Sequence, residues 1–326
     1  MVHRFDIVIV TPALADANNG NWQTAQRWAG MLAQAYRVRL ASTWEHGDEA
    51  LLIALHARRS AASLAAWHAQ RAGRPSVLVL TGTDLYRDIA GDAAAQRSLQ
   101  HADRLVVLNE LGAQALPPAL RPRARVLLQS CSARRSPIKP TRHLRALMVG
   151  HLREEKSPRT YFEAARLLAQ RPDLRLDHIG AALDPVLGAQ AGALATSCPH
   201  YRWLGALPHT STRRRIQAAH VLVHASRIEG GAHVVIEAVR SGTPVLASRI
   251  DGNVGLLGEN YDGYFPVGDA RALAAGLERL RDDPAMLVAL RAQCAARAPL
   301  FDPARERATL LALVNDLLTR TSGARP

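Results

Sequence analysis

The fold is decided by one stretch of the sequence, Val221-Leu-Val-His-Ala-Ser-Arg-Ile-Glu-Gly-Gly-Ala-His-Val-Val-Ile-Glu-Ala-Val-Arg-Ser-Gly-Thr-Pro-Val-Leu-Ala-Ser248. An apolar run, a loop with two glycines, apolar residues at helical spacing and a second apolar run predict strand, loop, helix and strand. A unit of this order and length forms a βαβ crossover of a parallel sheet, so the predicted class is α/β. Because ligands of such sheets bind beyond the carboxyl ends of the strands, we expect a site at residues 227–233.

Two features of this stretch carry chemistry. Gly230, Gly231 and Ala232 have almost no side chain where the helix is expected to begin, so backbone N–H groups there can approach a phosphate. Glu229 precedes this turn and Glu237 follows it, and the apolar spacing lets both carboxylates face a site. The alternative is a glycine-rich turn with two solvated glutamates, which the spacing alone does not exclude.

The rest of the chain repeats the alternation of strands and helices, as in a doubly wound sheet. Its 326 residues are enough for two domains of about 150 residues each. Two prolines and several charges without an apolar period at 134–141 predict a linker, with bounds 137–141, between a first domain at 1–136 and a second at 142–300. Strands are expected at 5–11, 38–42, 51–55, 77–80, 105–108, 126–128, 144–149, 176–179, 202–204 and 264–267, and helices at 24–35 and 63–70 and from residues 158, 270, 284 and 303.

The composition restricts the partners. Forty-one Lys and Arg against 28 Asp and Glu give a net charge of +13, which favours nucleic acid, an acidic membrane surface or phosphorylated small molecules. The arginines are scattered and aromatic residues make up only 5%, so we expect neither nucleic acid nor stable membrane insertion. Three widely spaced cysteines and the lack of a signal peptide or long apolar run predict a reduced, cytoplasmic protein without a structural zinc site.

Polar loops follow four of the strands expected in the first domain, at residues 11–22, 55–60, 81–88 and 129–130, and the last offers little beyond Gln129 and Ser130. Residues 55–60 bring His56, Arg58 and Arg59 together, and guanidinium groups match phosphate oxygens in pairs. A solvated helix start is the alternative for this loop. Residues 81–88 hold hydroxyls, a carboxylate that could cap a helix, and a further guanidinium, carried by Thr81, Thr83, Asp84 and Arg87.

The loop at residues 11–22 ends in Asn18-Asn-Gly-Asn21, which could supply backbone donors before a helix. In the second domain, residues 150–158 read Gly-His-Leu-Arg-Glu-Glu-Lys-Ser-Pro, where Ser157 is expected to cap a helix that begins at Pro158. Residues 251–258 contain three glycines and are expected to form a turn.

Glu229 and Glu237, with Gly230-Gly231 after the first, resemble the signature of nucleotide-sugar glycosyltransferases of the GT-B fold, which usually retain anomeric configuration. This resemblance implies two Rossmann-like doubly wound parallel-sheet domains facing a central cleft, and a last helix, here 301–326, that returns to the first domain. It implies that Glu229 contacts the sugar, Glu237 the ribose, and the backbone from Gly230 to His233 the diphosphate.

The same resemblance assigns further donor contacts. The loop with Gly20 and Asn21 is similar to one that reaches toward the substrates, and Leu207 occupies a position that lines the base. Lys156 matches a cation that clamps the diphosphate. The position of a second cation, an arginine in the family, is His151 here, and Arg153 is the candidate to replace it.

Longer blocks resemble the selenosugar synthase family of bacterial selenoneine biosynthesis over nearly the whole chain. The family has asparagine at the position of His233, a departure that bears on a contact to the donor sugar. The blocks are Gly20-Asn-Trp-Gln-Thr-Ala-Gln-Arg-Trp28, Ala54-Leu-His-Ala-Arg-Arg-Ser-Ala61, Leu80-Thr-Gly-Thr-Asp-Leu-Tyr-Arg-Asp88, Tyr201-Arg-Trp-Leu-Gly205 and Gly255-Leu-Leu-Gly-Glu-Asn-Tyr-Asp-Gly-Tyr-Phe-Pro-Val-Gly-Asp269.

This second resemblance implies transfer of a sugar from UDP-N-acetylglucosamine or UDP-glucose to the selenium of selenophosphate, with release of UDP and phosphate. The selenium is already anionic, so the site needs cations that position the acceptor more than a strong base. Glu229, His56 and Lys156 are the expected catalytic residues, and no metal or other cofactor is expected. The expected acceptor contacts are Arg58, Arg59, Thr81, Thr83, Asp84 and Arg87.

Two alternatives stay open. A conventional GT-B glycosyltransferase would act on a hydroxyl of a lipid or polysaccharide and would need an apolar or carbohydrate-lined acceptor site. A non-catalytic basic module would bind DNA or anionic vesicles in a salt-dependent way and would not turn over UDP-sugars.

Overall fold

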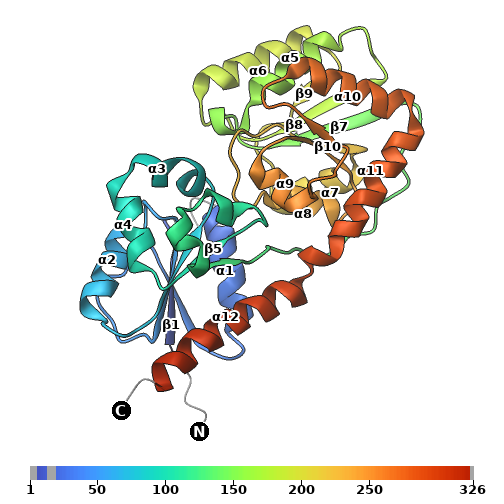
Figure 1. Ribbon diagram of the computed structural model, residues 1–326. Helices are drawn as coiled ribbons and strands as arrows, with labels where there is room; N and C mark the ends of the chain where they lie inside the picture. Colours follow the sequence, from blue (N-terminus) through green and yellow to red (C-terminus); the bar gives the residue numbers. More distant parts are fainter. Residues whose placement is uncertain (1–5, 13–19, 324–326) are drawn as a thin grey trace. The chain divides into compact units, whose positions relative to one another are not determined.

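The computed structural model describes residues 6–12 and 20–323, with the side chains of the last helix described as far as residue 319. Contacts between Cα atoms divide the chain into two compact units. The first consists of Met1–Ser130, Glu229–Gly231 and Pro303–Pro326, and the second of Cys131–Ile228 and Ala232–Asp302. Each unit contains a sheet of six parallel strands with helices packed on it (Figure 1). The predicted α/β class is confirmed.

The first unit has the strand order β2-β1-β3-β4-β5-β6. α-Helices connect β1 to β2, β3 to β4 and β4 to β5, and the last helix of the chain, α12, also belongs to this unit. The strands are β1 Asp6–Val10, β2 Arg37–Ala41, β3 Leu51–Leu55, β4 Ser76–Leu80, β5 Arg104–Val107 and β6 Ala124–Val126; the helices are α1 Gly20–Leu32, α2 Ala61–Gln70, α3 Ile89–Gly91, α4 Ala93–His101 and α12 Pro303–Gly323, with a π-helical turn η2 at Asp84–Asp88 and 3-10 turns η3 Gly112–Ala115 and η4 Pro118–Arg123.

Alternate residues of its strands enter two cores, one on each face of the sheet. Ile7 and Ile9 of β1 pack with α1 and α12, whereas Val8 and Val10 pack on the other face with α2 and α4. Since both faces are covered, β3 and β4 are buried at every position and show no polar alternation. The one polar side chain of these two strands is Ser76, the first residue of β4, and the other polar groups near them lie in the loops at the strand ends.

The second unit has the strand order β12-β11-β10-β7-β8-β9. It includes the stretch from residue 221 to 248, which forms strand, loop, helix and strand as predicted. The strands are β7 Leu144–Val149, β8 Leu174–Ile179, β9 Tyr201–Trp203, β10 Val221–His224, β11 Val245–Ser248 and β12 Tyr264–Phe265; the helices are α5 Pro158–Leu167, α6 Pro185–Ser197, α7 His209–Ala218, α8 His233–Val239, α9 Asp251–Leu257, α10 Ala270–Asp282 and α11 Pro284–Arg297, with 3-10 turns η5 Glu154–Lys156 and η6 Ala298–Phe301.

Several local expectations are corrected. Residues 251–257 form helix α9 rather than a turn: Gly252 and Gly255 are buried in the helix, and only Gly258 at its C-cap takes a positive φ, of 94°. Ser157 precedes α5 but does not cap it, because its hydroxyl pairs with that of Thr160 at 2.9 Å instead of a backbone N–H. Helices α4, α6 and α7 had no clear apolar period and were not expected.

The chain passes from one unit to the other between Ser130 and Cys131, before the proline-rich segment that we expected to be the linker. That segment is instead part of the second unit, where the Lys139 ammonium donates to the backbone carbonyl of Ala219. Prolines and charges mark this segment as irregular, but they do not prevent it from packing.

Helix α12 is tied to the first unit by one buried carboxylate. Glu306 is 1% exposed and accepts hydrogen bonds from Arg27 Nε at 3.0 Å, from Trp28 Nε1 at 2.7 Å and from the backbone N–H of Ser130 at 2.8 Å. The Ser130 hydroxyl donates to the same carboxylate. Apolar side chains of α12, among them Leu310 and Val314, complete the contact with the core under α1. A buried charge with this many donors is satisfied, and loss of the charge leaves its partners unpaired.

We predict that Glu306→Gln lowers the free energy of unfolding of the first unit by roughly 2–4 kcal/mol, because it weakens four charge-assisted hydrogen bonds at once. Urea unfolding followed by tryptophan fluorescence measures the change. Glu163→Gln is the control, since the Glu163–Arg166 pair is about half exposed on both sides and should contribute under ~1 kcal/mol. Equal effects of the two substitutions would contradict the role given to Glu306.

Candidate functional site

In the second unit, Glu237 of α8 is at the centre of a cluster of basic side chains. It is 2% exposed, yet three groups surround its Oε1: His209 Nε2 at 2.6 Å, His233 Nδ1 at 3.4 Å and Arg213 Nη1 at 3.6 Å. His209 and Arg213 come from α7, one turn apart, and His233 is the first residue of α8. The structure therefore brings the predicted ribose contact Glu237 together with His233, and adds His209 and Arg213, which the sequence analysis did not identify.

This cluster fixes the charge of Glu237. Burial alone would raise the pKa of its carboxyl, but the hydrogen bonds from His209 and His233 and the charge of Arg213 outweigh burial and lower the pKa to about 2. The carboxylate is therefore ionised throughout the neutral range. Among the described residues no hydrogen bond reaches its second oxygen, Oε2, which is left to accept from a ligand hydroxyl.

The loop after β7 carries the predicted cations Arg153 and Lys156. Arg153 is exposed, and Lys156 ends the 3-10 turn η5, with its stem against Gly150. The backbone N–H of Arg227, in the loop after the neighbouring strand β10, donates to the Glu155 carbonyl at 2.8 Å. Two loops at the carboxyl edge of the sheet are thus held together, as the position of the expected site requires.

His151 does not act as the missing cation of this loop. Its Nδ1 accepts a hydrogen bond from the backbone N–H of Ala181 at 3.0 Å, so the ring is held in a neutral form with the proton on Nε2. Burial, followed by the charges of Arg153 and Lys156, lowers the pKa of His151. The positive charge of the loop therefore comes from Arg153 and Lys156.

The remaining residues that we predicted to contact the donor lie in three different segments of the chain. Ala232 is buried and Gly230 to Ala232 precede α8, which begins at His233 and is only seven residues long. Leu207 lies in the loop between β9 and α7 with its carbonyl accepting from Thr212 Oγ1 at 3.4 Å. Gly20 and Asn21 form the first turn of α1 rather than a loop, and Asn18 and Asn19 lie outside the described residues.

In the first unit, the loops after β3 and β4 are held together by Asp84. Its carboxylate is fully buried and accepts from the backbone N–H groups of Ala57 at 2.9 Å, Thr81 at 2.9 Å and Gly82 at 2.8 Å. Asp84 was expected to contact the acceptor or to cap a helix; instead its oxygens are occupied by the two loops. We assign it the role of positioning the residues around it.

His56 lies in this loop pair in a strained left-handed conformation, with φ 75°. Its Nδ1 accepts from the backbone N–H of Arg59 at 3.4 Å, which leaves the proton on Nε2, 3.4 Å from Thr83 Oγ1. Burial, more than the neighbouring charges, lowers the pKa of the imidazole, although Asp84 acts in the opposite direction. His56 is therefore a neutral donor at pH 7.

Two of the three arginines of these loops share one carboxylate that no pattern in the sequence indicated. Asp88 is 7% exposed and pairs with Arg58 Nε at 3.3 Å and Arg87 Nε at 3.2 Å. Arg59 is exposed and forms no ion pair in the described part of the chain. The arginine side chains are about half exposed while Asp88 is not, so the loops present a net positive, donor-rich surface.

The segment Glu229–Gly231 is grouped with the first unit. Within that unit, Asn109 Nδ2 donates to the Gly230 carbonyl at 2.7 Å, and a Cβ on Gly230 would overlap the carbonyl of Thr81. Glycine is therefore required at position 230 by close backbone approach, and Asn109, which follows β5, is a further residue that the sequence analysis did not identify.

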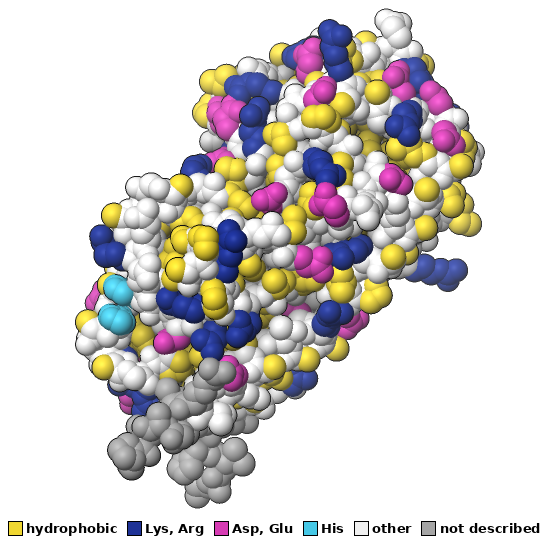
Figure 2. Space-filling view, in the orientation of Figure 1, with side chains coloured by type: hydrophobic (Ala, Val, Ile, Leu, Met, Phe, Trp, Pro, Cys, Tyr) yellow, Lys and Arg dark blue, Asp and Glu magenta, His cyan; other side chains and the backbone are white. Residues whose placement is uncertain are grey.

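Three general properties of the described residues bear on the kind of ligand: surface charge, metal-binding groups and membrane-spanning helices. Lys and Arg side chains are spread among acidic ones over the face in view and do not gather in one stripe (Figure 2). Among residues 6–12 and 20–323, no group of three or more His, Cys, Asp or Glu is arranged to hold a metal ion. None of the described helices is long and apolar enough to span a membrane.

Comparison with known families identifies the second unit. Residues 132–300, just over half of the chain, match the family model "Glycosyl transferases group 1". The chain belongs to this glycosyltransferase family. The match covers both the Glu237 cluster and the loop with Lys156, and it makes the protein an enzyme of sugar transfer.

Solved structures with the GT-B fold resemble this glycosyltransferase over nearly its whole length. Sucrose-phosphate synthase from Thermosynechococcus elongatus is 17% identical with a TM-score of 0.77, over 97% of this chain and 100% of that one. HepE from Anabaena, solved with UDP and glucose, is 16% identical with a TM-score of 0.74, over 96% and 100%. Trehalose 6-phosphate synthase from Burkholderia multivorans is 15% identical with a TM-score of 0.70, over 85% and 72%. At these identities the likeness concerns the fold.

The low pKa of Glu237 predicts how stability depends on pH. A folded-state value of about 2 against an ordinary value near 4.5 corresponds to about 3 kcal/mol at neutral pH. Because the pKa is lowered by folding, this stability is present above about pH 4.5 and is lost as the pH falls toward 2. Glu237→Gln should therefore destabilise the protein by about 3 kcal/mol at pH 7 and by much less at pH 3.

Urea unfolding followed by circular dichroism between pH 3 and 7 measures this difference. Glu259→Gln is the matched control, because Glu259 pairs with Arg249 while 65% exposed and should have an effect below ~1 kcal/mol at every pH. A Glu237→Gln effect that is independent of pH would show that packing, and not the ionised carboxylate, is what the substitution removes.

Proposed function

We propose that this glycosyltransferase is a selenosugar synthase, which transfers a hexose from a UDP-sugar to the selenium of selenophosphate. The observation that carries the proposal is the loop pair of the first unit, which carries Arg58, Arg59 and Arg87, two of them paired with the buried Asp88. Three guanidinium groups on a small polar surface suit an inorganic trianion. A lipid or sugar acceptor would be better served by apolar or carboxylate side chains.

The donor is assigned to the second unit. HepE, of the same fold, was solved with UDP and glucose, which supports a UDP-sugar here. The ionised Glu237, with Oε2 available, would accept from a ribose hydroxyl, and Leu207 would line the base. Arg153 and Lys156, with the backbone at Ala232, would face the diphosphate, where negative charge increases as UDP departs.

The chemistry needs little acid or base assistance. The bond from the anomeric carbon to selenium forms as the bond from that carbon to the UDP oxygen breaks, and the electron pair leaves with UDP. Attack of water on the phosphorus of the resulting selenium–phosphorus bond then releases phosphate and leaves the sugar selenolate. Since the selenium is anionic from the start, the neutral His56 would orient the acceptor as a hydrogen-bond donor, and Glu229 would contact the sugar.

The first experiment is anaerobic incubation with selenophosphate and either UDP-N-acetylglucosamine or UDP-glucose, followed by mass spectrometry for the selenium isotope pattern. We expect a selenium-bearing hexose, UDP and phosphate, a rate unchanged by EDTA because no metal is proposed, and loss of about a hundredfold or more in Glu229→Ala. UDP release without a selenium product would move the assignment to a hydroxyl acceptor. Absence of turnover with any UDP-sugar would contradict the donor assignment as well.

Kinetics of two variants separate the donor and acceptor sites. Arg58→Ala should raise the KM for selenophosphate roughly tenfold and leave the KM for the UDP-sugar unchanged, because one charge-assisted contact is lost. Glu237→Gln should do the reverse. Arg37→Ala is the control, since Arg37 pairs with Asp6 on the surface with its side chain 68% exposed. If both variants changed the same KM, the division of roles between the units would be wrong.

A further inference from the structure

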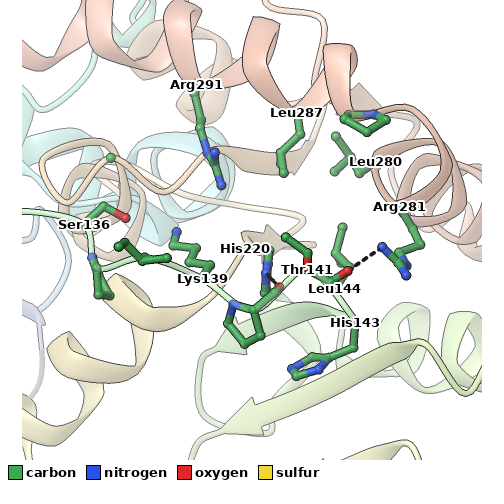
Figure 3. A pocket seen from close by; sticks show the side chains of 15 residues that line it. Ser136, Lys139, Thr141, His143, Leu144, His220, Leu280, Arg281, Leu287 and Arg291 are labelled. Carbon is green, nitrogen blue, oxygen red and sulfur yellow. Dashed lines mark hydrogen bonds between the residues drawn. The ribbon is translucent and has the colours of Figure 1, made fainter.

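The second unit contains a pocket of about 450 Å³ that none of the donor residues lines. Its walls come from the segment 136–144, from His220 and Gly242, and from helices α10 and α11 (Figure 3). The volume is within the usual range of small-molecule sites, roughly 300–1,000 Å³.

The pocket is at the opposite edge of the sheet from the donor site. Leu144 is the first residue of β7, His220 immediately precedes β10, and Gly242 lies shortly before β11. Strands of this sheet are parallel, so these residues mark its amino edge. Lys156 and His233 follow the carboxyl ends of β7 and β10, and a ligand in the pocket would therefore be separated from them by the length of the strands.

Two cations of the pocket have no acidic partner among the residues that the structure describes. Lys139 donates to the carbonyl of Ala219 and is 3.5 Å from Thr243 Oγ1, both of which are uncharged groups. Arg291 extends from α11 toward Lys139 and forms no hydrogen bond or ion pair in the part of the chain that the structure describes (Figure 3). Burial, and then the charge of Arg291, lowers the pKa of Lys139 to about 8. An anion between the two side chains would relieve this unfavourable charge.

The third cation is already neutralised and helps to shape the wall. Arg281 pairs with Asp173 at 2.7 Å and donates to the carbonyl of Thr141 at 3.0 Å, so it holds the segment 136–144 against α10. The uncompensated charge of the pocket is thereby confined to Lys139 and Arg291.

A buried histidine adds unused hydrogen-bonding capacity. His143 lines the pocket at 4% exposure, and neither of its ring nitrogens has a hydrogen-bond partner within the described residues. The neighbouring His220 is satisfied: Nδ1 accepts from the N–H of Arg145 at 2.9 Å, and Nε2 donates to the carbonyl of Pro140 at 2.9 Å. Orphaned polar groups of this kind are costly unless a ligand or water meets them.

Apolar side chains form the remainder of the walls. Leu144, Leu280 and Leu287 line the interior, and Ile138 is fully exposed at the pocket, an unusual position for a large aliphatic residue. No carboxylate side chain is among the lining residues.

We propose that this pocket binds a small amphipathic anion, a phosphate or carboxylate group joined to a short apolar body. The anionic group lies between Lys139 and Arg291, and the apolar body covers Ile138 and Leu287. The site is additional to the proposed transfer reaction, and its occupancy does not depend on that assignment.

Isothermal titration calorimetry with hexyl phosphate tests the proposal. Hexanol tests the contribution of the apolar body alone, and inorganic phosphate tests that of the anionic group alone. We expect hexyl phosphate to bind more tightly than either probe, and Arg291→Ala to weaken it roughly tenfold. Arg291 forms no hydrogen bond or ion pair among the described residues, so Arg291→Ala should have the melting temperature of the wild type. Leu287→Asp should weaken binding because it places a carboxylate in the apolar wall. Arg279→Ala, an exposed arginine of α10 outside the pocket, is the matched control.

Two further measurements complete the test. Saturating UDP should leave hexyl phosphate binding unchanged; displacement by UDP, or equal binding by wild type and Arg291→Ala, would overturn the proposal. Sedimentation with vesicles that contain phosphatidate distinguishes the source of the ligand. Binding that is lost in Arg291→Ala would point to a lipid headgroup, whereas hexyl phosphate binding without vesicle binding would point to a soluble molecule.

Discussion

A parallel strand that is covered on both faces carries few polar side chains before it ends, and this constraint places most of the polar groups of the protein at the strand ends. β3 and β4 are buried at all five positions, and β7 and β10 are almost as deeply buried. Hydrogen-bonding and charged groups therefore follow the strand ends: His56 after β3, Thr81 after β4 and Lys156 after β7. The same constraint explains the second pocket, because the amino ends of β7 and β10 are the other place where this sheet can meet a polar ligand.

Three buried carboxylates show how partners distinguish structural roles from functional ones. Asp84 accepts from three backbone N–H groups, and Glu306 from an arginine, an indole and a serine. Both have their oxygens fully used, so both serve to join segments that are distant in sequence. Glu237 is different: its partners crowd around one oxygen, two of them are histidines, and the other oxygen has no hydrogen bond among the described residues. A carboxylate that its neighbours keep ionised, and that has one oxygen without a hydrogen bond among the described residues, is suited to bind a ligand.

Much of the fold could be predicted from the sequence because apolar runs in buried parallel strands are continuous. The residues 51–55 and 144–149 were predicted with their observed bounds. Helices such as α6 and α9 could not be predicted, since one is rich in Ala and Gly and the other has glycines that tertiary packing buries. The partners of individual side chains were harder to predict than the helices. Asp88 contacts Arg58 of another loop and Arg213 contacts Glu237 of another helix, and the spacing of residues within one segment does not indicate such contacts.

The state of His56 bears on which acceptor is chemically reasonable. A hydroxyl acceptor gains from a base that removes its proton, and a histidine with a lowered pKa whose Nδ1 already accepts from the Arg59 backbone has its proton on the other nitrogen. That imidazole offers a donor and not a base to whatever approaches Nε2. The arginines around it likewise offer only donors, and the buried Asp88 forms ion pairs with Arg58 and Arg87. Under the proposed function, these donors suit a nucleophile that arrives already deprotonated, such as the selenium of selenophosphate.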